Sequence, residues 1–138
     1  MKKKINVLVV EDNEYYNKLL TGALSRSIRS LPGKSRFEMS FHSFTNSLEC
    51  MKKIKSRKLS SYDTIAFVDY YVGHGINGGH ILKLLKEQNN DTMVILLSQT
   101  KNIEQKLEQN NSSYFVVKDS YAPALCCLYL EQYLESKI

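Results

Sequence analysis

The chain has 138 residues, of which 43% are apolar and 24% charged, with two prolines and six glycines. A domain of this length can bury a core, and the composition argues against disorder. The formal net charge of +5 comes largely from lysine-rich segments without interleaved aromatic residues, which argues against direct nucleic acid binding.

The N-terminal segment, MKKKINVLVV, combines lysines with an apolar run, as a secretion signal does. Asn6 interrupts the run, and the acidic Glu11 and Asp12 follow where a signal peptide needs small residues for cleavage. The longest apolar runs are also far too short to span a bilayer. We therefore expect a cytoplasmic protein with no membrane partner.

Three cysteines, Cys50, Cys126 and Cys127, cannot all pair within one chain. The adjacent pair lies in a stretch with helical periodicity, and no nearby group would activate a thiolate. A vicinal redox pair is the alternative interpretation. We expect reduced thiols that pack as small apolar residues, which fits a cytoplasmic location.

Strand and helix patterns alternate along the chain, because short apolar runs are separated by segments with apolar residues at helical spacing. The expected strands are residues 5–10, 37–44, 64–69, 93–98 and 114–117. The expected helices are residues 14–30, 47–58, 79–88, 102–109 and 122–136. Five such units predict an α/β fold, in which a doubly wound parallel sheet carries helices on both faces.

The second strand differs from the others in its pattern. In RFEMSFHSF, Phe37, Met39 and Phe41 alternate with polar residues, which is typical of a half-exposed edge strand. The first, third and fourth strands are apolar enough for the centre of the sheet. Right-handed crossovers then favour the strand order 2-1-3-4-5.

Carboxylates follow two central strands: Glu11 and Asp12 follow the first, and Asp69 ends the third. These strands are neighbours at the point where the sheet order reverses, so the three side chains should meet in one crevice. Three negative charges there repel one another unless a cation joins them, and Mg²⁺ suits oxygen ligands of this kind. Alternatively, Glu11 and Asp12 are helix-start residues favoured by the helix dipole.

The fourth and fifth strands should place two further groups at the same edge of the sheet. Ser98 ends the fourth strand, and Lys118 follows the fifth. A lysine at the end of a buried strand is costly without an anionic partner. A hydroxyl and an ammonium are suitable partners for phosphoryl oxygens attached to, or approaching, Asp69.

These segments resemble the receiver domains of two-component response regulators, the CheY-like family. VLVVEDN is similar to the family's acidic pocket, and FVDYYVGHGINGG to its phosphoacceptor strand and loop. VILLSQT and YFVVKD are similar to its fourth and fifth strands. The resemblance covers the whole chain and implies one receiver domain over residues 1–138, with the flavodoxin-like (βα)5 fold.

The resemblance also implies a role for each site residue. Asp69 would accept the phosphoryl group, Ser98 and Lys118 would hold its oxygens, and Phe115 would be the aromatic switch residue that responds to Ser98. For Phe115 plain core packing is the alternative. The implied Mg²⁺ ligands are Glu11, Asp12, Asp69 and the carbonyl of Tyr71.

The function implied is phosphorelay signal transduction in a two-component system. A sensor histidine kinase or a phosphotransfer protein would donate the phosphoryl group, giving an aspartyl phosphate. The signal would pass to a downstream protein target, or to an output domain missing from this chain, and a homodimer would be possible. The domain would be no enzyme beyond phosphorylating itself from small phosphodonors and slowly dephosphorylating itself.

Two positions depart from the family pattern. Asp119 follows Lys118 where the family usually has a proline in a cis peptide, so we expect a trans peptide, competition of Asp119 for the ammonium and a weaker hold on the phosphoryl group. Gln99 stands where the family has a small residue. Together with Tyr71 it should narrow the path of attacking water, which predicts slow dephosphorylation.

Two other classes of function fit parts of the pattern. A magnesium-dependent phosphohydrolase of the haloacid-dehalogenase type would also use an aspartyl phosphate, but it needs a second aspartate where this chain has Tyr71. A phosphorylation-independent interaction module would merely retain the pocket. The complete set of site residues argues against that module.

Overall fold

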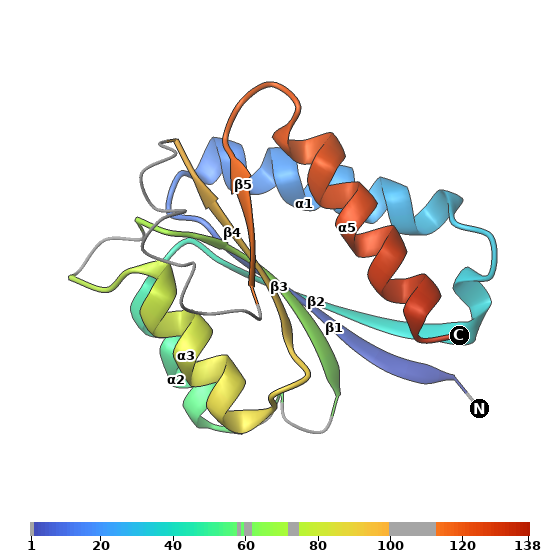
Figure 1. Cartoon of the computed structure of the whole chain (residues 1–138), viewed down its shortest axis with the longest axis horizontal. Coiled ribbons are helices and arrows are strands. Elements are labelled where there is room, and N and C mark those ends of the chain that lie inside the picture. The colour runs from blue at the N-terminus through green and yellow to red at the C-terminus, as the bar shows by residue number, and fades with distance from the viewer. Residues whose placement is uncertain (1, 58, 60–61, 72–74, 100–112) are drawn as a thin grey trace.

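The computed structural model describes residues 2–57, 59, 62–71, 75–99 and 113–138. They form one five-stranded parallel sheet in the order β2-β1-β3-β4-β5, with helices on both of its faces (Figure 1). The predicted α/β fold and strand order are therefore confirmed. The strands are β1 (Lys3–Val10), β2 (Phe37–Phe44), β3 (Asp63–Asp69), β4 (Met93–Ser98) and β5 (Ser113–Val117).

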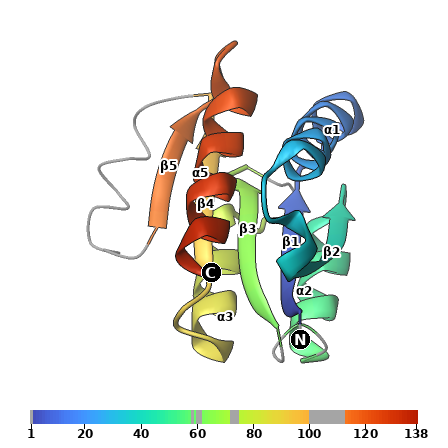
Figure 2. The same cartoon turned by 90° about the vertical axis from the view of Figure 1, so that its right-hand side faces the viewer.

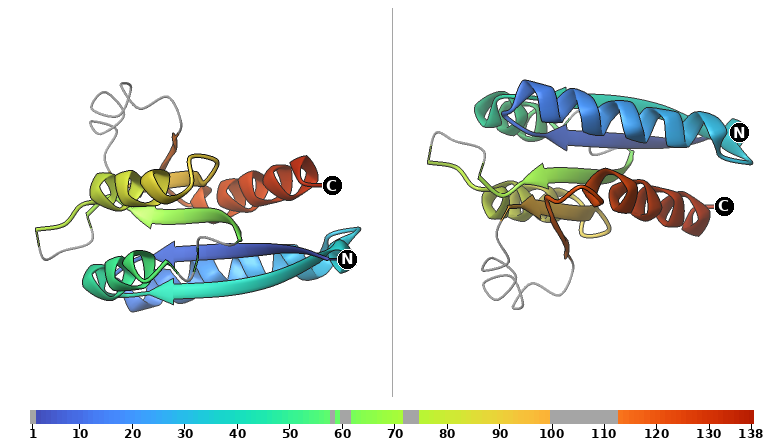
Figure 3. Two further views of the ribbon diagram at one scale, coloured as in Figure 1. Left: turned by 90° about the horizontal axis from the view of Figure 1, so that it is seen from below. Right: turned by 90° about the horizontal axis from the view of Figure 1, so that it is seen from above.

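The helices are α1 (Glu14–Ser30), α2 (Ser47–Lys55), α3 (Gly78–Gln88) and α5 (Ala122–Ser136), and a short 3-10 helix, η1 (Lys34–Arg36), precedes β2. Helices α1 and α5 lie side by side on one face of the sheet, and α2 and α3 lie on the other (Figures 2 and 3). The predicted helix over residues 102–109 lies outside the described residues. None of the described helices combines the length and the apolar character that a membrane crossing requires.

Side-chain alternation on the central strands builds two separate cores. In β1, Val7 and Val9 belong to the core under α1 and α5, whereas Leu8 and Val10 belong to the core under α2 and α3. Each central strand is buried on both faces, which explains its uninterrupted apolar sequence. β2 pairs only with β1 and is half-exposed, as its alternating sequence predicts.

The second helix ends three residues earlier than the pattern predicts. α2 ends at Lys55, and Arg57 then adopts a positive φ of 61°, which no helix can include. Cys126 is buried in the core under α1 and α5. Burial raises the pKa of its thiol to about 12, so it packs as an apolar residue, as expected.

Gly78, the first residue of α3, lies directly behind the end of β3. A Cβ atom there would approach the backbone Cα of Tyr70 to 2.9 Å and the carbonyl oxygen of Asp69 to 3.0 Å. Neither backbone atom can move without moving the loop that follows β3. The absence of a side chain thus lets α3 begin against the strand end.

Replacing Gly78 by alanine should lower the free energy of unfolding by about 1–3 kcal/mol, because the new methyl group overlaps backbone atoms. Gly22→Ala in α1 is the matched control, since its Cβ meets only the flexible end of Arg26 at 3.3 Å. That control should gain about 0.5–1 kcal/mol from helix propensity. Urea denaturation of both variants measures the difference, and an equal effect of the two would contradict the steric explanation.

Candidate functional site

A cleft of about 310 Å³ opens at the carboxyl edge of the sheet, where β1, β3, β4 and β5 end. We call it the acidic cleft. Its lining contains every residue that the sequence analysis predicts to bind metal or phosphoryl oxygens. Phe115, the predicted switch residue, is not among the lining residues. The lining residues are Glu11, Asp12, Asn13, Asp69, Tyr71, Ser98, Gln99 and Lys118.

Hydrogen bonds of the sheet continue one residue past the strand ends and fix the backbone of the cleft. The Glu11 N–H donates to the carbonyl of Phe44 (2.9 Å), and the Lys118 N–H donates to the carbonyl of Ser98 (2.8 Å). The Tyr70 N–H, just after Asp69, donates to the carbonyl of Leu97 (2.8 Å). The side chains of the cleft therefore project from backbone held by strand pairing.

Three carboxylates converge in the cleft. One oxygen from each of Glu11, Asp12 and Asp69 lies within 4.8 Å of the others. Glu11 and Asp69 are buried, whereas Asp12 is exposed. This donor set fits a hard divalent cation, because carboxylate oxygens at the mouth of a cleft leave room for water and phosphate oxygens on the cation's other side.

Lys118 supplies the positive charge between the two buried carboxylates. Its ammonium forms ion pairs with Oε1 of Glu11 and, at 3.3 Å, with Oδ2 of Asp69. The other oxygen of Glu11 accepts from the Asn13 N–H (3.1 Å), and Oδ1 of Asp69 accepts from the Tyr71 N–H (3.4 Å). Two carboxylates thus share one ammonium and two backbone donors.

Burial dominates the ionisation of both carboxylates. It raises the pKa of Glu11 to about 7, despite the Lys118 ammonium and the Asn13 N–H, both of which favour the charged form. Burial also raises the pKa of Asp69, again against the opposing influence of Lys118. Without a further cation, the cleft carries more negative charge than its own donors balance.

The remaining predicted residues lie at different depths. Ser98 is buried at the end of β4, Gln99 is exposed beside it, and the Tyr71 side chain is 61% exposed at the rim. Phe115 is half-buried and packs against the core under α2 and α3. Tyr71 and Gln99 thus both line the cleft, and their effect on attacking water stays a prediction.

Asp119 has a different partner from the one expected. Its carboxylate accepts from the Tyr121 N–H (2.9 Å) in the turn before α5, whereas the ion pairs of Lys118 are with Glu11 and Asp69. The expected competition of Asp119 for the ammonium is therefore not seen. The described residues contain no cis peptide bond, so the Lys118–Asp119 peptide is trans, as predicted.

Two residues of α1 that sequence reasoning missed support the cleft. The Tyr16 ring lies 4.7 Å from Nζ of Lys118, and its hydroxyl is buried without a hydrogen-bond partner among the described residues. The buried amide of Asn17 donates to the carbonyls of Glu11 and Phe44, both at 3.1 Å. Asn17 is a polar residue at a buried position of α1, in line with Leu20 and Leu24, and this pattern could have indicated its role from the sequence. The sequence around Tyr16 contains no comparable indication.

No family model and no curated protein sequence matches the chain, but solved structures do. The response regulator DrrB of Thermotoga maritima aligns with a TM-score of 0.65 and 19% identity, over 99% of this chain and 54% of its own. A two-component response regulator from Cytophaga hutchinsonii aligns with a TM-score of 0.67 and 25% identity, over 94% of this chain and 97% of its own.

TrrA of Thermotoga maritima, another response regulator, was solved in complex with Mg²⁺-BeF. It aligns with a TM-score of 0.61 and 20% identity, over 95% of this chain and 99% of its own. The chain has the fold of a response-regulator receiver domain. It spans about half the length of DrrB. In this fold the acidic cleft lies at the carboxyl ends of the strands.

Replacing Glu11 by glutamine should stabilise the metal-free chain by about 1–3 kcal/mol at pH 8, because one buried charge is removed and Asp69 keeps Lys118. The folded-state pKa of Glu11, about 7, lies above its ordinary value of 4.5. The native protein therefore holds a proton that the unfolded chain releases, and its stability falls as the pH rises through that window. Glutamine does not titrate, so the gain should shrink at pH 5. Denaturation at both pH values in EDTA measures it, and a loss of stability at pH 8 would contradict the charge imbalance.

The contact between Tyr16 and Lys118 should appear as a coupling free energy of about 0.5–2 kcal/mol. Denaturation of Tyr16→Leu, Lys118→Met and the double variant gives this coupling. Tyr16→Phe is the matched control, since it keeps the ring and removes only the unpartnered hydroxyl, so it should be at least as stable as the parent chain. Additive effects of the two substitutions would show that the ring does not hold the ammonium.

Proposed function

We propose that this chain is a receiver that accepts a phosphoryl group on Asp69 from a phosphohistidine of a sensor histidine kinase or a phosphotransfer protein. One observation carries the proposal: the ammonium of Lys118 lies against Asp69 in a cleft that also holds Glu11 and Asp12. The fold of response-regulator receivers supports it, since those proteins belong to two-component signalling.

Glu11, Asp12, Asp69 and the carbonyl of Tyr71 would hold Mg²⁺. The spacing of the three carboxylates supports this assignment, as does the Mg²⁺-BeF complex of TrrA. Mg²⁺ supplies positive charge that offsets the charge of the transferring oxygens. With that added charge, Glu11 and Asp69 would no longer depend on the ammonium of Lys118 alone. Lys118 could then contact the incoming phosphoryl group.

The transfer itself needs little covalent chemistry from the protein. A carboxylate oxygen of Asp69 attacks phosphorus, the phosphorus–nitrogen bond of the donor breaks, and the histidine keeps the electron pair and takes up a proton. Lys118 and the hydroxyl of Ser98 would donate hydrogen bonds to the phosphoryl oxygens. The main task of the cleft is to position the reacting groups.

The output would be a shift between two conformations. Ser98 would move toward the phosphoryl group and Phe115 would turn into the vacated space, which would change the protein-binding face around β5 and α5. The half-buried position of Phe115 supports this role, because a partly exposed ring can change its burial. Docking to a target protein, to an output domain or to a second copy would read that face.

Several further assignments belong to the same proposal. Residues 1–138 would act as a single receiver domain in the cytoplasm, without direct contact to nucleic acid or membrane. The domain would be no enzyme beyond phosphorylating itself from small phosphodonors and slowly dephosphorylating itself. The exposed Tyr71, where a phosphohydrolase of the haloacid-dehalogenase type needs a general acid, supports storage of the phosphoryl group over turnover.

Incubation with Mg²⁺ and acetyl phosphate should give one phosphate adduct in the intact mass of the chain. Asp69→Asn should abolish the adduct, because the nucleophile is gone, and hydroxylamine should release it, as expected for an acyl phosphate. Asp63→Asn is the matched control, because Asp63 lies at the opposite end of β3 from Asp69 and is partly exposed. This variant should still form the adduct. Consumption of acetyl phosphate without an adduct would favour the phosphohydrolase, and no reaction at all would favour an interaction module.

A further inference from the structure

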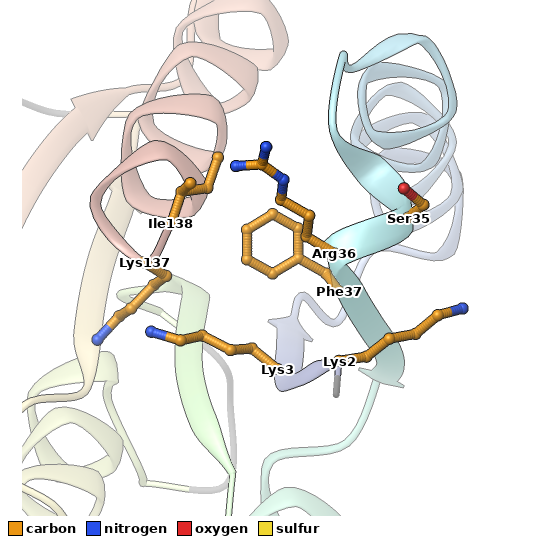
Figure 4. A pocket seen from close by; sticks show the side chains of 7 residues that line it. All are labelled: Lys2, Lys3, Ser35, Arg36, Phe37, Lys137 and Ile138. Atoms are coloured by element: carbon orange, nitrogen blue, oxygen red, sulfur yellow. The ribbon is translucent and has the colours of Figure 1, made fainter.

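A second hollow, of about 420 Å³, lies at the opposite end of the sheet, where β1 and β2 begin and α5 ends. Its lining comes from three segments that are far apart in the sequence (Figure 4). We call it the basic hollow, since four of its seven lining residues are cationic. The seven lining residues are Lys2, Lys3, Ser35, Arg36, Phe37, Lys137 and Ile138.

The cations of the basic hollow have little compensation from the protein. Lys137 forms one long ion pair, at 3.7 Å, with the partly exposed Asp63. For Lys2, Lys3 and Arg36 the described part of the chain contains no ion pair. Unlike the acidic cleft, this hollow therefore has a surplus of positive charge.

The directions of the side chains concentrate this charge. Figure 4 shows the ammonium groups of Lys3 and Lys137 extending toward one another and the guanidinium of Arg36 extending past the ring of Phe37 toward Ile138, whereas Lys2 points away. Like charges repel at such a place unless an anion lies between them. Two ammonium groups thus converge from β1 and the end of α5, and the guanidinium of Arg36 lies on the other side of the Phe37 ring.

We propose that the basic hollow binds a small, multiply phosphorylated anion of nucleotide size. Its volume falls in the range of small-molecule sites and is too large for a single phosphate. Arg36 offers a planar fork for phosphate oxygens, and the two lysines offer point charges. The ring of Phe37 and the side chain of Ile138 supply an apolar wall for the rest of the molecule.

A concave site of this kind favours a small molecule over an acidic peptide, because a peptide needs an extended groove or a free sheet edge. The proposal goes beyond phosphoryl transfer at Asp69 and does not depend on it. An anion at this position would link the end of α5 to β1 and to η1.

Calorimetric titration of the full chain with ATP in EDTA tests the proposal, since without a metal ion the acidic cleft repels anions. We expect one bound ATP per chain, and a loss of affinity of at least about tenfold in the variant Lys3→Gln/Arg36→Gln. Both residues are exposed, so this variant should fold, and a far-UV circular dichroism spectrum and urea denaturation like those of the parent chain check that it does.

The matched control is Lys52→Gln/Lys55→Gln, which removes the same charge from an exposed stretch of α2 and should keep the affinity. An equal loss in both variants would overturn the proposal, because binding would then follow net charge alone. Absence of ATP binding by the parent chain would overturn it as well. So would binding of adenosine as tight as that of ATP, or tighter binding of a hexaglutamate peptide.

Discussion

Two buried carboxylates share a single ammonium at the carboxyl edge of the sheet, and this imbalance of charge shapes the candidate site. Glu11 and Asp69 are only 2% and 7% exposed, so water screens them poorly. Their positions follow from β1 and β3, whose apolar residues fill both cores and hold the strands in register. Apolar burial in the sheet thus offsets the cost of keeping the two charges together, and the resulting donor set fits an added divalent cation.

The parallel topology also explains why the two ends of the sheet differ in charge. Helices α1 and α3 begin beside the acidic cleft, so their dipoles present partial positive charge to its carboxylates. Helix α5 ends beside the basic hollow, where the negative end of its dipole favours nearby cations such as Lys137. Each cluster of charge is therefore placed where the helices stabilise it.

The sequence predicts those parts of the molecule that follow from burial along a single element. The apolar runs of β1, β3 and β4 and the alternation of β2 carry the strand order, and the polar residues after the strands indicate where a site would lie. Contacts between distant elements leave no such pattern. The ring of Tyr16 meets Lys118 only because the start of α1 and the end of β5 both lie at the acidic cleft. The end of α2 depends on a left-handed Arg57, with no glycine to signal it. What could not be predicted from the sequence thus depends on tertiary contacts rather than on local conformational preferences.

The division of the interior into two cores constrains how a change in the acidic cleft can spread. On β5, Val116 belongs to the core under α1 and α5, whereas the neighbouring Phe115 faces the core under α2 and α3. Helices α1 and α5 are joined further by a hydrogen bond from Ser27 to Glu131 (2.8 Å). A rotation of Phe115 would repack only the second core, because the sheet separates the two. The packing of α1 against α5 can therefore persist, while the surface that β5 and α5 form together changes at Phe115.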